Sequence, residues 1–132
     1  MKLILVYLAS LVVFLAFDFV WLRLIAKDIY ASEMGSLIRP DVNLQAAIAF
    51  YLLYAAGLTY FAVMPALESR AILQALALGA GLGLVAYGTY DLTNLAVVKG
   101  FGTKIALIDL AWGTALSGIS AASVVALLGH SS

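Results

Sequence analysis

The chain has 132 residues, enough for one domain of ordinary size. Hydrophobic residues make up 65% and charged residues 11%, against roughly 45–50% and 25% in soluble domains, which excludes a disordered chain and argues strongly against a soluble fold. Seven basic and seven acidic residues cancel, so no nucleic-acid partner is expected, and the absence of cysteine excludes disulfides, thiolate metal sites and iron–sulfur clusters.

Four apolar segments are each long enough to cross a bilayer, which takes about 20 residues. They cover residues 3–26, 43–64, 71–98 and 104–128. We therefore predict an all-α fold, an integral membrane bundle of four transmembrane helices that forms a single domain over residues 1–132. The connections after the second and third segments are short, so the last three helices should be antiparallel neighbours.

The first segment follows Lys2 and superficially looks like a secretory signal. However, its apolar run is too long, it contains Asp18 and Trp21, and no small-residue cleavage site follows. We expect it to be retained as a transmembrane helix.

Polar residues and prolines mark the boundaries of the later segments. Asp41 is a candidate cap for the second helix, Ser69 for the third and Thr103 for the fourth. Pro65 follows the second segment.

The distribution of basic residues predicts the orientation in the membrane. Arg23, Lys27, Arg39, Lys99 and Lys104 lie on the side of the first and third loops, whereas Lys2 and Arg70 lie on the other side. By the positive-inside rule, loops 27–42 and 99–103 are predicted to be cytoplasmic, with both termini outside.

Three carboxylates lie inside the apolar segments: Asp18, Asp91 and Asp109. Each costs about 2.5–3.5 kcal/mol on insertion scales, so an intramembrane aspartate suggests a function by default. Counted from the same membrane face at 1.5 Å per residue, all three lie about 8–12 Å below the surface. Their common depth predicts a single site.

Helical spacing supports this convergence. Gly79, Gly83, Tyr87 and Asp91 recur every four residues on one face of the third segment. Asp109 begins a similar stripe of small residues on the fourth. Small residues allow close helix packing, and the same stripes then deliver a phenol and two carboxylates.

Two interpretations of the polar cluster compete. In the first it binds a ligand or a proton, and in the second it fixes helix packing through ion pairs with Arg23, Lys99 and Lys104, cations that could also hold a lipid headgroup. Tyr51 and Tyr54 lie slightly deeper and could donate hydrogen bonds to the carboxylates. The candidate ligand- or proton-binding residues are Asp91, Asp109, Asp18, Asn94, Tyr87, Tyr90, Thr93, Trp112 and Trp21, of which the tryptophans could instead be interface anchors.

Three stretches of the chain carry a resemblance to a known family. They are Tyr87-Gly-Thr-Tyr-Asp-Leu-Thr-Asn94, Lys99-Gly100 and Asp109-Leu-Ala-Trp-Gly113, with Asp18-x-x-Trp21 earlier in the chain. The sequence resembles a family of small bacterial integral membrane proteins catalogued as a domain of unknown function. The resemblance implies a four-helix protein of the bacterial inner membrane. It implies no activity, cofactor or catalytic residue.

Three functions remain open from the sequence. The first is binding or transport of a proton, cation or small solute at the intramembrane cluster, which would favour a homodimer because four helices enclose little space. The second is an accessory or assembly subunit of a larger membrane complex. The third is a lipid-headgroup-modifying enzyme, in which aspartates act as acid and base or hold Mg²⁺. We expect membrane lipids as partners, no bound cofactor and no resident metal, and we consider an enzyme less favoured.

Overall fold

The computed structural model describes residues 3–21, 23 and 43–129. Within these residues, four helical stretches are long and apolar enough to cross a membrane, which confirms the predicted fold class. The elements are α1 (Leu3–Val20), α3 (Leu44–Leu58) continuing through the π-helical turn η3 (Thr59–Val63) into α4 (Met64–Ser69), α5 (Ile72–Val97) and α6 (Thr103–Leu128).

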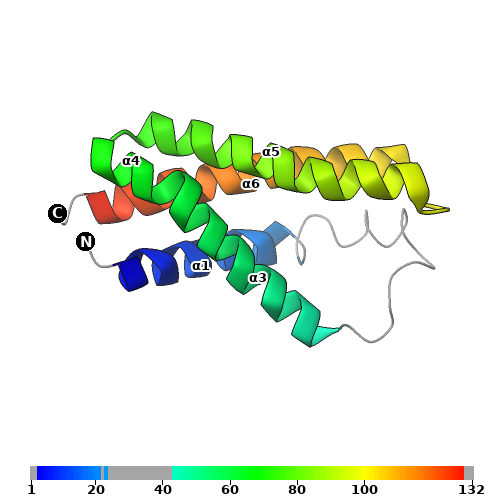
Figure 1. Cartoon of the computed structure of the whole chain (residues 1–132), viewed down its shortest axis with the longest axis horizontal. Helices are drawn as coiled ribbons and strands as arrows, with labels where there is room; N and C mark the ends of the chain where they lie inside the picture. The colour runs from blue at the N-terminus through cyan, green and yellow to red at the C-terminus, as the bar shows by residue number, and fades with distance from the viewer. Residues whose placement is uncertain (1–2, 22, 24–42, 130–132) are drawn as a thin grey trace.

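The helices do not pack equally (Figure 1). α5 and α6 run antiparallel in contact along their length, and α1 packs on α6 and α3. α3 meets α5 mainly through η3 and α4, near the end of the bundle where both chain termini lie. Towards the opposite end, α3 diverges from α5 (Figure 1).

Glycines explain why α5 and α6 approach so closely. A Cβ atom added at Gly79 would lie 2.5 Å from the Ser117 carbonyl oxygen, and one at Gly83 would lie 2.4 Å from the Gly113 carbonyl oxygen. Both distances are too short for a real side chain, so only glycine fits at these two crossings. The predicted small-residue face of the third segment is therefore the α5–α6 interface.

The second transmembrane helix is longer than predicted. It continues past Pro65 to Ser69 instead of ending at residue 64. The π-helical turn η3 directly precedes the proline. In it the Met64 N–H donates to the Thr59 carbonyl, five residues back. Pro65 then occupies the first turn of α4, where a missing N–H does little harm.

The helix caps differ from the predicted ones. Asn43 caps α3, its Oδ1 accepting from the Ala46 N–H at 3.1 Å, while Asp41 lies outside the described residues. Ser69 ends α4 instead of capping α5, whose N-cap position is Ala71; its hydroxyl bonds to carbonyls one turn back and to the Gln74 side chain. Thr103 is already within α6.

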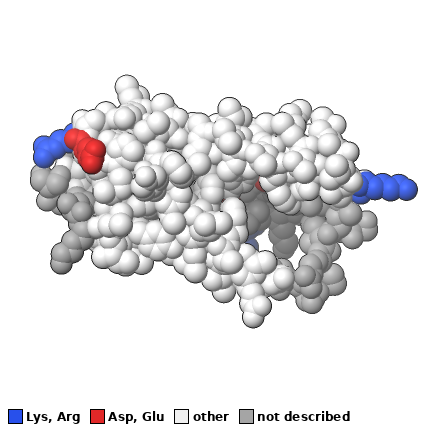
Figure 2. All heavy atoms as spheres, in the orientation of Figure 1, with Lys and Arg blue, Asp and Glu red and all other residues white. Residues whose placement is uncertain are grey.

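The main apolar core lies towards the end that carries the termini. It is built from side chains of every helix, and its largest fully buried apolar members are Val6, Phe14, Leu58, Val63, Leu116 and Val124. Figure 2 shows charged atoms mainly at the two ends of the visible face, and between them the surface is uncharged apart from small acidic and basic patches inside a hollow. Most polar residues predicted for the site lie beyond this core, towards the loop between α5 and α6.

Candidate functional site

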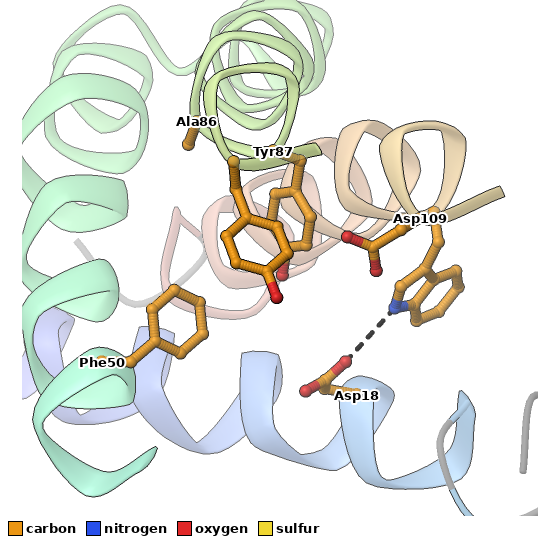
Figure 3. Close-up of a pocket in the computed structure, with 7 residues that line it drawn as sticks. Asp18, Phe50, Ala86, Tyr87 and Asp109 are labelled. Carbon is orange, nitrogen blue, oxygen red and sulfur yellow. Dashed lines mark hydrogen bonds between the residues drawn. The ribbon is translucent and has the colours of Figure 1, made fainter. Parts of the chain in front are cut away.

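A pocket of about 440 Å³ lies between the helices at this end of the bundle. All four transmembrane helices contribute to it, and Figure 3 shows side chains from them pointing into one space. Its lining residues are Asp18, Phe50, Ala86, Tyr87, Tyr90, Asp109 and Trp112. Five of these seven belong to the site predicted from the sequence.

The helix boundaries agree with the predicted depth for Asp91 and Asp109, whereas the predicted end of the first segment, from which the depth of Asp18 was counted, lies outside the described residues. Asp109 lies six residues after Thr103, where α6 begins, and Asp91 lies six residues before Val97, where α5 ends. At 1.5 Å per residue, both carboxylates are about 9 Å inside the bundle. The pocket is therefore embedded within the transmembrane segments.

Asp18 is held by hydrogen bonds from two other helices. Only 7% of its surface is exposed. Its Oδ2 accepts a hydrogen bond from the Tyr51 hydroxyl at 2.5 Å, and its Oδ1 accepts one from Trp112 Nε1 at 3.2 Å. These bonds join α1, α3 and α6 at one point. The expected donation by Tyr51 is therefore confirmed.

The two tryptophans form a stacked pair. The rings of Trp21 and Trp112 lie 4.4 Å apart with an angle of 11° between their planes. Trp21 follows Asp18 by three residues, so the two lie on nearly the same helical face. The stack holds the Trp112 ring in place while its N–H reaches Asp18. Trp112 thus lines the pocket, and Trp21 packs against it from outside the lining residues.

The ring of Tyr87 forms the inner wall of the pocket and depends on Gly113. A Cβ atom at Gly113 would lie 2.1 Å from this ring, so the ring rests directly on the α6 backbone. Behind it, Tyr54 meets Tyr87 edge-on at 6.0 Å and shares a hydrogen bond of 2.6 Å with Ser117. Tyr54 therefore bonds to a serine and not to a carboxylate, and this layer separates the pocket from the apolar core.

Asp91 occupies a different position from the other two aspartates. It is fully buried and does not line the pocket. Neither of its oxygens meets a partner with hydrogen-bonding geometry in the described part of the chain. The Asp109 side chain nevertheless lies close enough to interact with it electrostatically. The three aspartates thus form a pocket pair, Asp18 and Asp109, with Asp91 beside Asp109. Across the described residues, no group of three or more His, Cys, Asp or Glu side chains could hold a metal ion.

The remaining residues of the YGTYDLTN stretch divide between the pocket and the surface. Tyr90 lines the pocket, and its ring meets that of Phe101 edge-on at 6.4 Å. Asn94 is half-buried one turn further along α5 and interacts with the Tyr90 side chain. Thr93 is exposed and lies outside the pocket.

The three predicted cationic partners lie outside the pocket. Lys99 and Lys104 are exposed on either side of the α5–α6 turn, and Arg23 is exposed in a shallower depression beside Tyr51. The hydrogen-bond partners of Asp18 are a tyrosine and a tryptophan. Within the described part of the chain, the contacts seen for this carboxylate are thus hydrogen bonds, and the competing ion-pair interpretation of the cluster stays a prediction.

Sequence reasoning missed Phe50 and Ala86. Phe50 is 43% exposed, and its ring lies 5.2 Å from that of Tyr51. A phenylalanine in a transmembrane segment normally faces lipid, so no local pattern marks it as a pocket residue. Its only signal is its position beside Tyr51, which was expected to reach the carboxylates.

Fold and pocket together define a four-helix integral membrane protein with an acidic, aromatic-lined site inside the bundle. The family described as "Predicted membrane protein (DUF2177)" matches residues 3–126, and the chain belongs to this family. The matched range contains every residue of the signature from which the resemblance was drawn. Neither a curated protein nor a solved structure matches the chain.

Proposed function

We propose that the protein binds a small positively charged solute or ion in this pocket, as the binding step of its transport across the bacterial inner membrane. The supporting observation is that Asp18 and Asp109, from two different helices, line one pocket within the transmembrane segments. Intramembrane carboxylates that face a shared cavity are typical of cation and proton pathways.

The sign of the charge in the pocket favours a cation. Two of the seven lining residues are acidic and none is basic. Low-dielectric surroundings strengthen the attraction between a carboxylate and a bound cation compared with water. An anion would meet the same field as repulsion.

The surroundings of the pocket favour a binding site over an open channel. Tyr54 and Ser117 share a hydrogen bond behind it, and the apolar core continues from there towards the termini. A bound cation can therefore cross only if the helices rearrange. A homodimer or a larger complex would supply surfaces for that movement. The roles of accessory subunit and lipid-modifying enzyme remain alternative predictions from the sequence.

Ligand-induced thermal stabilisation of the full chain in detergent would test the proposal. The panel would contain alkali and divalent metal ions, organic ammonium ions and matched anions. We expect a cation to stabilise the wild type, with binding at least about tenfold weaker in Asp109→Asn, because a hydrogen bond to a charged group contributes about 1.5–3 kcal/mol.

Glu68→Gln is the matched control, because it removes an exposed carboxylate at the opposite end of the bundle. It should bind as the wild type does. Stabilisation by anions and cations alike, or by neither, would contradict the proposal. If neither kind of ion stabilises the protein, co-purification of one stoichiometric partner would favour the role of accessory subunit.

A further inference from the structure

We infer that the cation bound by this pocket is organic, an ammonium group attached to an apolar body. This inference rests on the proposed function and names its ligand class. It follows from the aromatic lining, the volume and the engagement of Asp18.

The aromatic lining distinguishes an ammonium group from a metal ion. Four rings line the pocket and come from three helices, α3, α5 and α6: Phe50, Tyr87, Tyr90 and Trp112. An aromatic face attracts an ammonium group, most strongly where water is excluded. Metal ions such as Mg²⁺ and Ca²⁺ prefer oxygen ligands, of which these rings offer only two phenol oxygens.

The contacts of the carboxylates also favour an ammonium group over a metal ion. Both oxygens of Asp18 already accept hydrogen bonds, from Tyr51 and Trp112. No cluster of three or more metal-ligating side chains exists among residues 3–21, 23 and 43–129. An ammonium group does not need a coordination shell, because its charge is attracted by a carboxylate that keeps its own donors.

The volume fits an organic molecule. About 440 Å³ is available, while one water takes up about 30 Å³ in the liquid. A bare metal ion or a proton would leave most of this space unfilled. Pockets that bury small organic ligands measure about 300–1,000 Å³.

The arrangement of the side chains gives the ligand an orientation. Asp18 and Asp109 lie on one side of the space in Figure 3, and Phe50 and Ala86 lie on the other, with Tyr87 between them. The ammonium group would lie near the carboxylates and the indole of Trp112. The apolar body would lie against Phe50 and Ala86.

Two sources could supply this ammonium chemistry. One is a free amine or quaternary ammonium ion, and the other is an amphiphile with an ammonium headgroup, such as an ethanolamine phospholipid. Both present the same group to Asp109 and the rings, so competition experiments must separate them.

Binding of benzyltrimethylammonium to the full chain in a non-ionic detergent would test the inference by calorimetry. Neopentylbenzene is its neutral isostere and serves as competitor, alongside Na⁺, Mg²⁺ and an ethanolamine-headed lysolipid. We expect saturable binding of the ammonium ion, without competition from the neutral isostere or the metals. Competition by the lysolipid would assign the natural ligand to the lipid source, and its absence would assign it to a soluble amine.

Ring-removing variants test the role of the aromatic lining. Phe50→Leu keeps an apolar side chain but removes one ring, so it should weaken binding about two- to fivefold. Tyr60→Leu is the control, because Tyr60 is 71% exposed on the same transmembrane helix and lies outside this pocket. It should leave the affinity unchanged.

The possible failures are distinguishable. If Na⁺, Mg²⁺ or protons bind at Asp109 and the ammonium ion does not, the inference is wrong and the proposed function stands. If the neutral isostere binds as tightly as the ammonium ion, the site recognises apolar solutes. The inference and the proposed function are then both wrong. Failure of every cation in both panels would overturn the proposed function and this inference with it.

Discussion

Asp18 and Asp91 are the same residue type inside the same bundle, but their surroundings are opposite. Asp18 receives hydrogen bonds from Tyr51 and Trp112 and thereby links three helices. Asp91 is fully buried, and its oxygens meet no hydrogen-bonding partner in the described part of the chain. A buried polar group contributes to stability only when its hydrogen bonds are satisfied. The two aspartates should therefore differ in their effect on folding.

The substitution to alanine makes this difference measurable. Asp18→Ala leaves two donors unpaired and should lower the free energy of unfolding by about 1–3 kcal/mol for each. Asp91→Ala removes a buried carboxyl whose oxygens meet no hydrogen-bonding partner among the described residues, so it should change the stability by less than about 1 kcal/mol or increase it. Reversible unfolding in mixed micelles would measure both variants, and equal losses would contradict our account of Asp91.

Sequence reasoning identified the polar residues but not all of their partners. Depth along the helices selected the aspartates, and helical spacing selected Tyr87. Tyr51 and Tyr54 are one turn apart and looked equivalent, yet only Tyr51 faces Asp18, while Tyr54 bonds to Ser117. The angle at which α3 crosses α1 decides between them, and no local pattern encodes that angle. Phe50 was missed for the same reason.

At the scale of elements, the α5–α6 pair is the most continuous packing in the structure. Gly79 and Gly83 allow backbone atoms of the two helices to approach each other directly. Because the Tyr87 ring rests on the α6 backbone at Gly113, the same interface also shapes the wall of the pocket. Changes at this interface should therefore alter both stability and binding.

Two glycine variants separate packing from helix propensity. A Cβ at Gly83 would lie 2.4 Å from a backbone oxygen, so Gly83→Ala should destabilise the protein by about 1–3 kcal/mol and weaken ligand binding. A Cβ at Gly81 would meet nothing within 4 Å, so Gly81→Ala should be neutral or stabilising by up to about 1 kcal/mol. Unfolding and binding titrations of the pair would test this, and similar behaviour would show that the contact is not decisive.

The second transmembrane helix shows where prediction of elements fails. Hydropathy located the segment correctly, but Pro65 suggested that it ends there. In the structure, the π-helical turn η3 shifts the hydrogen-bond pattern before the proline, and the helix continues to Ser69. A widened turn depends on packing against α5, α6 and α1. Local propensity therefore gave the position of the helix but not its end.

At the scale of the whole molecule, both termini lie at one end of the bundle and the α5–α6 turn lies at the other (Figure 1). This arrangement agrees with four membrane crossings. The excess of basic residues near loops 27–42 and 99–103 leads us to predict that the pocket lies in the cytoplasmic half of the bilayer.

Single cysteines can test this orientation, because the natural chain contains none. Ser69→Cys and Thr103→Cys introduce nearly isosteric thiols at exposed positions at opposite ends of the bundle. In spheroplasts, a membrane-impermeant maleimide should label Ser69→Cys at once and Thr103→Cys only after permeabilisation. The reverse order would invert the proposed topology, and immediate labelling of both would indicate two orientations in one membrane.

The stacked indoles have a practical consequence for studying this protein. Trp21 and Trp112 are the only tryptophans in the chain, so its indole emission arises wholly from one stacked pair, of which Trp112 lines the pocket. Two nearly parallel rings at 4.4 Å should also couple their electronic transitions and give a paired circular-dichroism band. Any occupant that displaces Trp112 would change both signals. The protein thus carries an unlabelled optical reporter of its own occupancy.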